Sequence, residues 1–237
     1  MSERAFHGPQ AVAPSTLGSS RLRWSLAIFG AFVLLAAWII ADLSSKTRHD
    51  LRDFDPAKVA RLETSMWRSY YDHERLRLFS ELGELLRRQY HLPLWSSWKG
   101  AFHAARAAVI FQKGRGREDY LRALPDLEKF YGLIHRHSQT SFDVRAVAAL
   151  ELEWWIVHRE RARHSRRRLE TALAELQSRI YGLPPSRFDE HARARAEAML
   201  LRDARAESGG VSENDWQQIG ALLNRSWLSL HHAVSAG

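Results

Sequence analysis

Residues 24–43 read WSLAIFGAFVLLAAWIIADL, and this segment decides the architecture of the chain. No charged residue occurs from Trp24 to Ala41, a run of 18 residues. A helix of that length extends about 27 Å, close to the hydrocarbon core of a bilayer, which is about 30 Å thick. Trp24 and Trp38 lie toward its two ends, as is typical of residues at a membrane–water interface. We therefore predict a transmembrane helix over residues 22–44, with lipid contacts through residues 24–43.

The alternative for this segment is a cleaved signal peptide, whose apolar region spans about 7–15 residues before a small-residue cleavage site. Here the apolar run is longer, and residues 41–45, ADLSS, make a poor cleavage site. We therefore predict an uncleaved signal anchor in a single-pass membrane protein. Arg21 and Arg23 directly precede the run. Because basic residues favour the cytoplasmic side, we expect a cytoplasmic N-terminus and a large domain on the non-cytoplasmic side. Residues 1–20 predict a disordered tail.

The remainder of the chain predicts an all-α domain over residues 55–234. Of the 237 residues, 45% are hydrophobic and nine are Trp, which is enough for a packed core. The 13 Gly and 7 Pro cluster at a few points, as expected for long helices joined by short turns. No segment shows the strict apolar–polar alternation that predicts a strand. The fold class is therefore all-α, behind one transmembrane helix.

Caps and helix breakers divide this domain into about seven helices. The expected helices cover residues 55–90, 93–114, 117–137, 142–162, 165–181, 186–208 and 212–234. Asp55 and Pro56 form an N-cap and a first-turn proline, and Ser212 with Asp215 resembles a capping box. The last six helices pair into hairpins of about 40–50 residues, which fits a bundle or a short stack of helical hairpins. No signature repeats between hairpins, which favours the bundle.

Several chemical functions have no support in the sequence. Cysteine is absent, which excludes disulfides, thiolate metal sites, iron–sulfur clusters and c-type haem. No nucleophile elbow or phosphate-binding glycine loop occurs, so we predict no catalytic residue and no cofactor. The net charge of +8 suits anionic lipid or an acidic protein. Nucleic acid is disfavoured because the aromatic residues belong to the core pattern and are not interleaved with arginines.

Four polar residues are expected on buried helix faces. Glu63 and Glu74 fall on the aromatic stripe of the predicted first helix, and Glu151 and His158 fall on the apolar side of the fourth. One interpretation is a di-metal site in the bundle, or haem bound through His158. However, Glu151 and His158 are about 10.5 Å apart along the helix axis, unlike the one-turn spacing of Glu-x-x-His. We prefer buried pairing of these groups with Arg, Tyr or Trp donors.

Residues 158–168 read HRERARHSRRR and form a basic run at the turn between the predicted fourth and fifth helices. Its arginines are Arg159, Arg161, Arg163, Arg166, Arg167 and Arg168. Such a run predicts a docking site for an acidic protein surface or anionic lipid headgroups. A solvated turn with local ion pairs is the alternative.

Three functions are compatible with these observations. The leading hypothesis is a non-enzymatic accessory or scaffold protein, which binds another membrane protein or assembly through the basic run. The second is a metal- or haem-binding oxidoreductase domain built on the buried acids and histidine. The third is a sensor or assembly factor whose helical hairpins bind a peptide.

Overall fold

A computed structural model of the chain describes residues 17–236, with side chains from residue 23 onward. Two compact units divide the chain, Met1–Ala41 and Asp42–Gly237. The described residues form helices joined by turns and irregular segments, and their only β pairing is one isolated bridge between His49 and Ser138. The predicted all-α class is therefore confirmed for the part of the chain that the structure describes.

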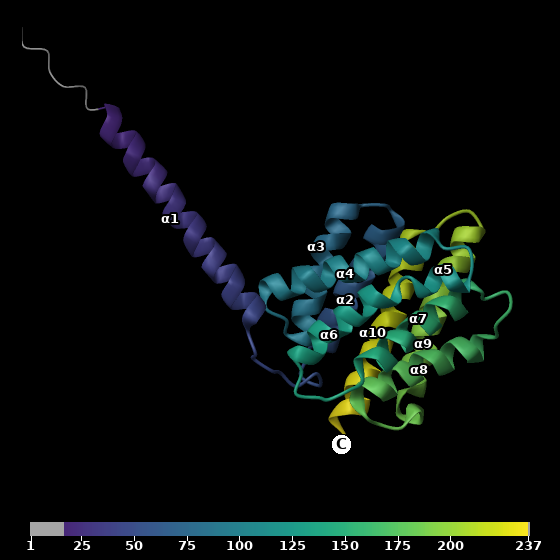
Figure 1. Cartoon of the computed structure of the whole chain (residues 1–237). Helices are drawn as coiled ribbons and strands as arrows, with labels where there is room; N and C mark the ends of the chain where they lie inside the picture. Colours follow the sequence, from purple (N-terminus) through teal and green to yellow (C-terminus); the bar gives the residue numbers. More distant parts are fainter. Residues whose placement is uncertain (1–16, 237) are drawn as a thin grey trace, which may run out of the picture. The chain divides into compact units, whose positions relative to one another are not determined.

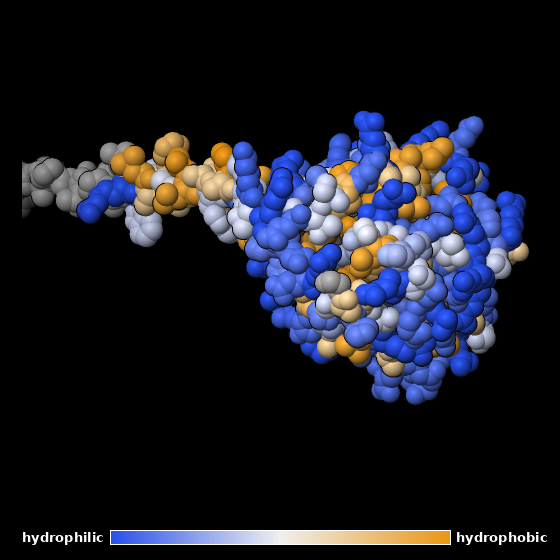
Figure 2. All heavy atoms as spheres, turned by 90° about the horizontal axis from the view of Figure 1, so that it is seen from below, coloured by the Kyte–Doolittle hydropathy of each residue, from blue (hydrophilic) through white to orange (hydrophobic). Residues whose placement is uncertain are grey.

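The first unit consists of helix α1, Leu17–Ser44. Within it, Arg23–Ser44 is long and apolar enough to cross a membrane, and no other described helix is. Its large apolar side chains are exposed, and its atoms are mostly orange in Figure 2, whereas the visible face of the second unit is mostly blue. Residues 1–16 of the predicted tail lie outside the described residues. Its last four residues, 17–20, belong to α1.

The second unit is a bundle of α-helices (Figure 1). Its elements are α2 (Pro56–Tyr71), α3 (Arg75–Tyr90), α4 (Leu94–Lys113), α5 (Arg117–Leu121), α6 (Leu124–Arg136), α7 (Val144–Arg159), α8 (Arg166–Tyr181), the 3₁₀ helix η1 (Pro185–Phe188), α9 (Asp189–Glu207) and α10 (Glu213–Ser235). Each long helix packs against the next one along the chain, and α10 returns to pack on α2. Arg68 near the end of α2 pairs with Glu213 at the start of α10, so these two helices are antiparallel. This closed ring of helices is a bundle and not an open stack of hairpins.

One apolar core holds these helices together. All the long helices contribute to it, with buried side chains that include Leu127 and Leu152, and Phe188 of η1 is also fully buried in it. Burying each such side chain contributes roughly 1.5–3 kcal/mol before the cost in conformational entropy. On α9 the core positions are mostly alanines, which let α8 and α10 approach its backbone closely.

The prediction of a single helix over residues 55–90 was wrong. The chain turns between α2 and α3, where His73 adopts the left-handed conformation (φ 59°). The two helices then form an antiparallel hairpin, in which the Ser65 and Ser69 hydroxyls donate to the Glu81 carboxylate at 2.5 and 2.7 Å. Because the helical register restarts at Glu74, positions after the turn do not follow the face calculated for one continuous helix.

Other boundaries follow the sequence more closely. The capping box of Ser212 with Asp215 is present at the start of α10, which confirms that prediction. Pro125 lies in the first turn of α6, and the expected helix over residues 117–137 is accordingly divided into α5 and α6.

The predicted helix start at Ser186 was wrong. Residues 185–188 form η1, and α9 begins at Asp189.

The chain enters the second unit through residues 42–55, and we call this end of the bundle the entry end. The Asp42 carboxylate accepts hydrogen bonds from the backbone N–H groups of Trp95 and Ser96 at 3.0 and 3.1 Å. His49 exchanges backbone hydrogen bonds with the segment after α6, and Leu51 is fully buried. The opposite end, which we call the far end, contains the turn between α7 and α8. The 16 residues of α7 separate the two ends by about 24 Å.

Candidate partner-binding surface

Glu63 is buried on α2 and forms an ion pair inside the bundle. Its carboxylate accepts two hydrogen bonds from the Arg195 guanidinium, at 2.5 and 2.9 Å, and one from the Trp227 indole N–H at 2.6 Å. Burial alone would lower the pKa of Arg195, but Glu63 raises it, so Arg195 stays charged. Both oxygens of the Glu63 carboxylate therefore accept from protein donors, two of these bonds coming from a charged group.

The other two glutamates lie in different surroundings. Glu151 accepts hydrogen bonds from the Tyr131 hydroxyl at 2.7 Å and from the Trp155 indole N–H at 2.9 Å. Glu74 is the N-cap residue of α3, where it is exposed and pairs with Arg77 at 3.1 Å. The expectation that Glu74 faces the core was wrong, because the turn at residues 72–74 moves it to a helix end.

His158 lies near the end of α7, with Nε2 3.1 Å from the Asp203 carboxylate. Burial tends to raise the pKa of Asp203, but His158, Arg202 and Arg161 outweigh burial and lower it. The structure thus separates the four predicted ligand residues into four sets of partners. Among the described residues, no group of three or more His, Cys, Asp and Glu side chains could hold a metal ion.

The basic run lies at the far end, and acidic side chains balance its charge. Ion pairs join Arg161 to Asp203 and Glu207, Arg163 to Glu160, Arg166 to Glu170 and Glu197, Arg167 to Glu170, and Arg168 to Glu153. Arg159 instead donates to the carbonyl oxygens of Phe111 and Gln112 at the C-terminal end of α4, where a cation is favourable. These contacts favour the alternative of local ion pairs over a free cationic patch.

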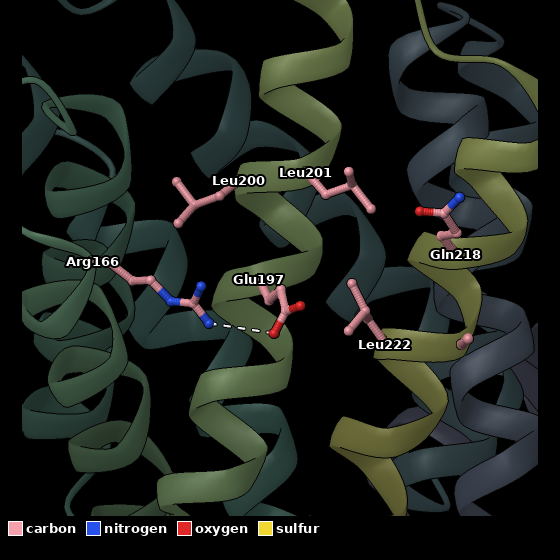
Figure 3. Close-up of a pocket in the computed structure, with 7 residues that line it drawn as sticks. Arg166, Glu197, Leu200, Leu201, Gln218 and Leu222 are labelled. Atoms are coloured by element: carbon pink, nitrogen blue, oxygen red, sulfur yellow. Dashed lines mark hydrogen bonds and ion pairs between the residues drawn. The ribbon is translucent and has the colours of Figure 1, made fainter.

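A groove of about 570 Å³ lies next to this run, along α9 and α10. Its lining residues are Arg166, Glu197, Leu200, Leu201, Gln218, Ala221 and Leu222. Figure 3 shows Leu201 of α9 and Leu222 of α10 on the two sides of the gap between these helices, with Arg166 reaching toward Glu197 from α8. The groove therefore combines an apolar lining with a charged rim, and one residue of the basic run belongs to it.

The sequence contains a signal for this groove that our sequence analysis did not use. On α9, Glu197 is followed by leucines three and four residues later, and on α10, Gln218 is followed by Ala221 and Leu222 at the same spacing. Each helix thus presents a polar residue and two apolar ones on one face. Periodicity alone does not reveal whether such a face is buried or open to solvent.

The rim of the groove carries paired charges of both signs. Glu197 is 3.4 Å from both Arg166 and Arg225, and each arginine has a second carboxylate partner, Glu170 or Glu190. The hydrogen bond with Glu170 is the main cause that raises the pKa of Arg166. Glu197 thus joins the two arginines, and each arginine is paired with two carboxylates.

Comparison of the chain with protein-family models, with curated proteins and with solved structures gives no match.

Proposed function

We propose that this protein is a membrane-anchored adaptor that binds an amphipathic helix of another membrane protein or assembly in the groove along α9 and α10. In this proposal α1 is a single-pass anchor with its N-terminus in the cytoplasm and the bundle on the opposite side. The groove beside the basic run is the observation that carries the proposal. Binding of a helix in this groove would combine the accessory role and the peptide-binding role expected from the sequence.

The shape and lining of the groove suit a helix as the occupant. Its volume of about 570 Å³ can hold several side chains, and its apolar positions come from two neighbouring helices. Helix-in-groove recognition uses apolar anchors spaced at i, i+3 or i+4, and i+7, which would insert between Leu201 and Leu222. An acidic residue at the edge of that helix would pair with Arg166 or Arg225 in place of Glu197, which is 3.4 Å from each.

A substitution at Ala221 tests the proposal without removing core packing, because this side chain is exposed. Ala221→Glu places a bulky anion in the groove, and the matched control Ala149→Glu adds the same charge at an exposed position of α7. Full-length protein would be extracted from its own membrane in mild detergent and analysed by native mass spectrometry. We expect Ala221→Glu to reduce the stoichiometric complex at least tenfold, and Ala149→Glu to retain it.

Retention of the complex by Ala221→Glu, at the level of the control, would show that the groove is not the binding site. The same spectra also test the oxidoreductase hypothesis, because bound metal or haem would add a defined mass to the protein. Thermal unfolding of both variants confirms that any loss of the complex does not come from loss of the fold.

A further inference from the structure

A row of apolar side chains runs along the outward face of α4. Trp95, Phe102 and Val109 follow one another at intervals of seven residues, so they lie on the same face of the helix. Phe102 and Val109 are 50% and 47% exposed. Trp98 lies beside this row, against Gly83 of α3. In a soluble bundle, an outward helix face normally carries polar side chains, so this row requires an explanation.

Cations border one side of this row, and acids are absent from the helix. The sequence of α4, LWSSWKGAFHAARAAVIFQK, contains no Asp or Glu. Lys99, Arg106 and Lys113 are exposed and lie within about 40° of Trp95 on the helical wheel. Arg106 pairs with Asp126 of α6 at 2.8 Å, but no ion pair is formed by Lys99 or Lys113 among the described side chains. Aromatic residues bordered by cations are typical of helices that lie in a bilayer interface.

The first turn of α4 is also tied to the residue at which the apolar segment ends. Asp42 is the first charged residue after the run that begins at Trp24, and it accepts hydrogen bonds from the backbone of Trp95 and Ser96. A carboxylate in this sequence position belongs at the membrane–water interface, where Trp side chains are enriched. With α1 as the proposed anchor, these hydrogen bonds would hold the start of α4 close to that interface.

Neighbouring helices also carry exposed apolar side chains. In the second unit, six large apolar or aromatic side chains are exposed, and four of them belong to α3, α4 and α5: Leu76, Phe102, Val109 and Leu121. Leu76 is 89% exposed, the largest value among them. The exposed apolar side chains are thus concentrated on the part of the ring that includes α4.

We infer that α4 lies along the headgroup region of the bilayer, with Trp95, Phe102 and Val109 inserted among the lipids and Lys99 and Lys113 bound to anionic headgroups. This inference rests on the proposed anchoring by α1 and adds a second membrane contact to it. The groove along α9 and α10 belongs to helices that do not neighbour α4 in the ring, so a partner can occupy it at the same time.

A labelling experiment tests this contact, and the cysteine-free chain makes it simple. Single cysteines replace Val109 or Leu228, which are both 47% exposed, and each carries the same fluorophore. A third label at Ala36 in α1 reports the anchor. The full chain is placed in nanodiscs of phosphatidylcholine and phosphatidylglycerol that carry brominated acyl chains, which quench fluorophores near lipid. Val109 is 14 residues beyond Trp95, about 21 Å, so it reaches lipid only if the whole helix lies along the bilayer.

We expect the label at 109 to be quenched several-fold more than the label at 228. The double variant Lys99→Glu and Lys113→Glu should abolish most of this difference, because the anionic headgroups then repel the helix. Equal, weak quenching at 109 and 228 with strong quenching at 36 would overturn the α4 contact and leave the anchor in place. A label at 109 shielded from both lipid and aqueous quenchers would also overturn it, because protein would then cover this face. No quenching at 36 would overturn the anchor itself and this contact with it.

Discussion

Substitution of Glu63 by Gln should destabilise the bundle strongly, because it leaves the Arg195 cation without its counter-charge. The two side chains are only 3% and 16% exposed, so water replaces little of the lost interaction. Breaking a buried pair by removing one partner costs about 3–5 kcal/mol. The amide oxygen of the substituted side chain can still accept from the Trp227 N–H, so we do not add a further cost for that bond. For a domain of this size, about 4 kcal/mol corresponds to a decrease in Tm of about 8–16 °C.

Urea unfolding of the purified chain in mild detergent, followed by circular dichroism, measures this loss. The control is Glu190→Gln, because Glu190 forms exposed ion pairs whose loss should cost at most about 1 kcal/mol. In an Arg195→Met background the Glu63→Gln substitution should also cost less than about 1 kcal/mol, since no buried cation remains. A loss from Glu63→Gln no larger than that from Glu190→Gln, or a cost unchanged in the Arg195→Met background, would refute this account.

Two further predictions concern stability. Burial lowers the pKa of His191 to about 3, below the value of about 6.5 expected in the unfolded chain. Between pH 7 and pH 5 the unfolded state therefore binds more protons than the folded state, and the free energy of unfolding should fall by about 2 kcal/mol. The His191→Gln variant should lack this pH dependence when urea unfolding is measured at the two pH values. Gly114→Ala should cost about 1–3 kcal/mol in thermal unfolding, because a Cβ there would lie 2.8 Å from the ring of the buried Tyr120. Gly132→Ala, in a helix with no atom within 4 Å of the added Cβ, should instead stabilise by about 0.5–1 kcal/mol.

Local chemistry in the sequence was sufficient to predict the class of the fold and several boundaries. The helix expected over residues 165–181 closely matches α8, because Ser165 supplies an N-cap oxygen and Gly182 adopts a left-handed conformation at the C-cap. The capping box at Ser212 is equally local, since its hydrogen bonds join residues three positions apart. The length of the uncharged run likewise predicts a helix long enough to cross a membrane, because both length and hydropathy belong to the segment itself.

Sequence reasoning failed where a residue's surroundings come from distant parts of the chain. The turn at His73 contains neither Gly nor Pro, yet His73 adopts a left-handed conformation between α2 and α3, which pack against each other. The predicted burial of Glu63 was correct, but its partner Arg195 is 132 residues away, and periodicity does not identify such a pair.

The same difference between local sequence information and tertiary contacts applies to the candidate binding surfaces. Helical spacing in the sequence determined that Leu201 and Leu222 share faces with other apolar residues, and that Phe102 lies on a row with Trp95 and Val109. Only the tertiary structure decided which of these faces the closed ring buries and which it leaves open. The physical reason is that side-chain burial depends on which helices pack together, and that order is set by contacts of the whole chain and not by any one helix.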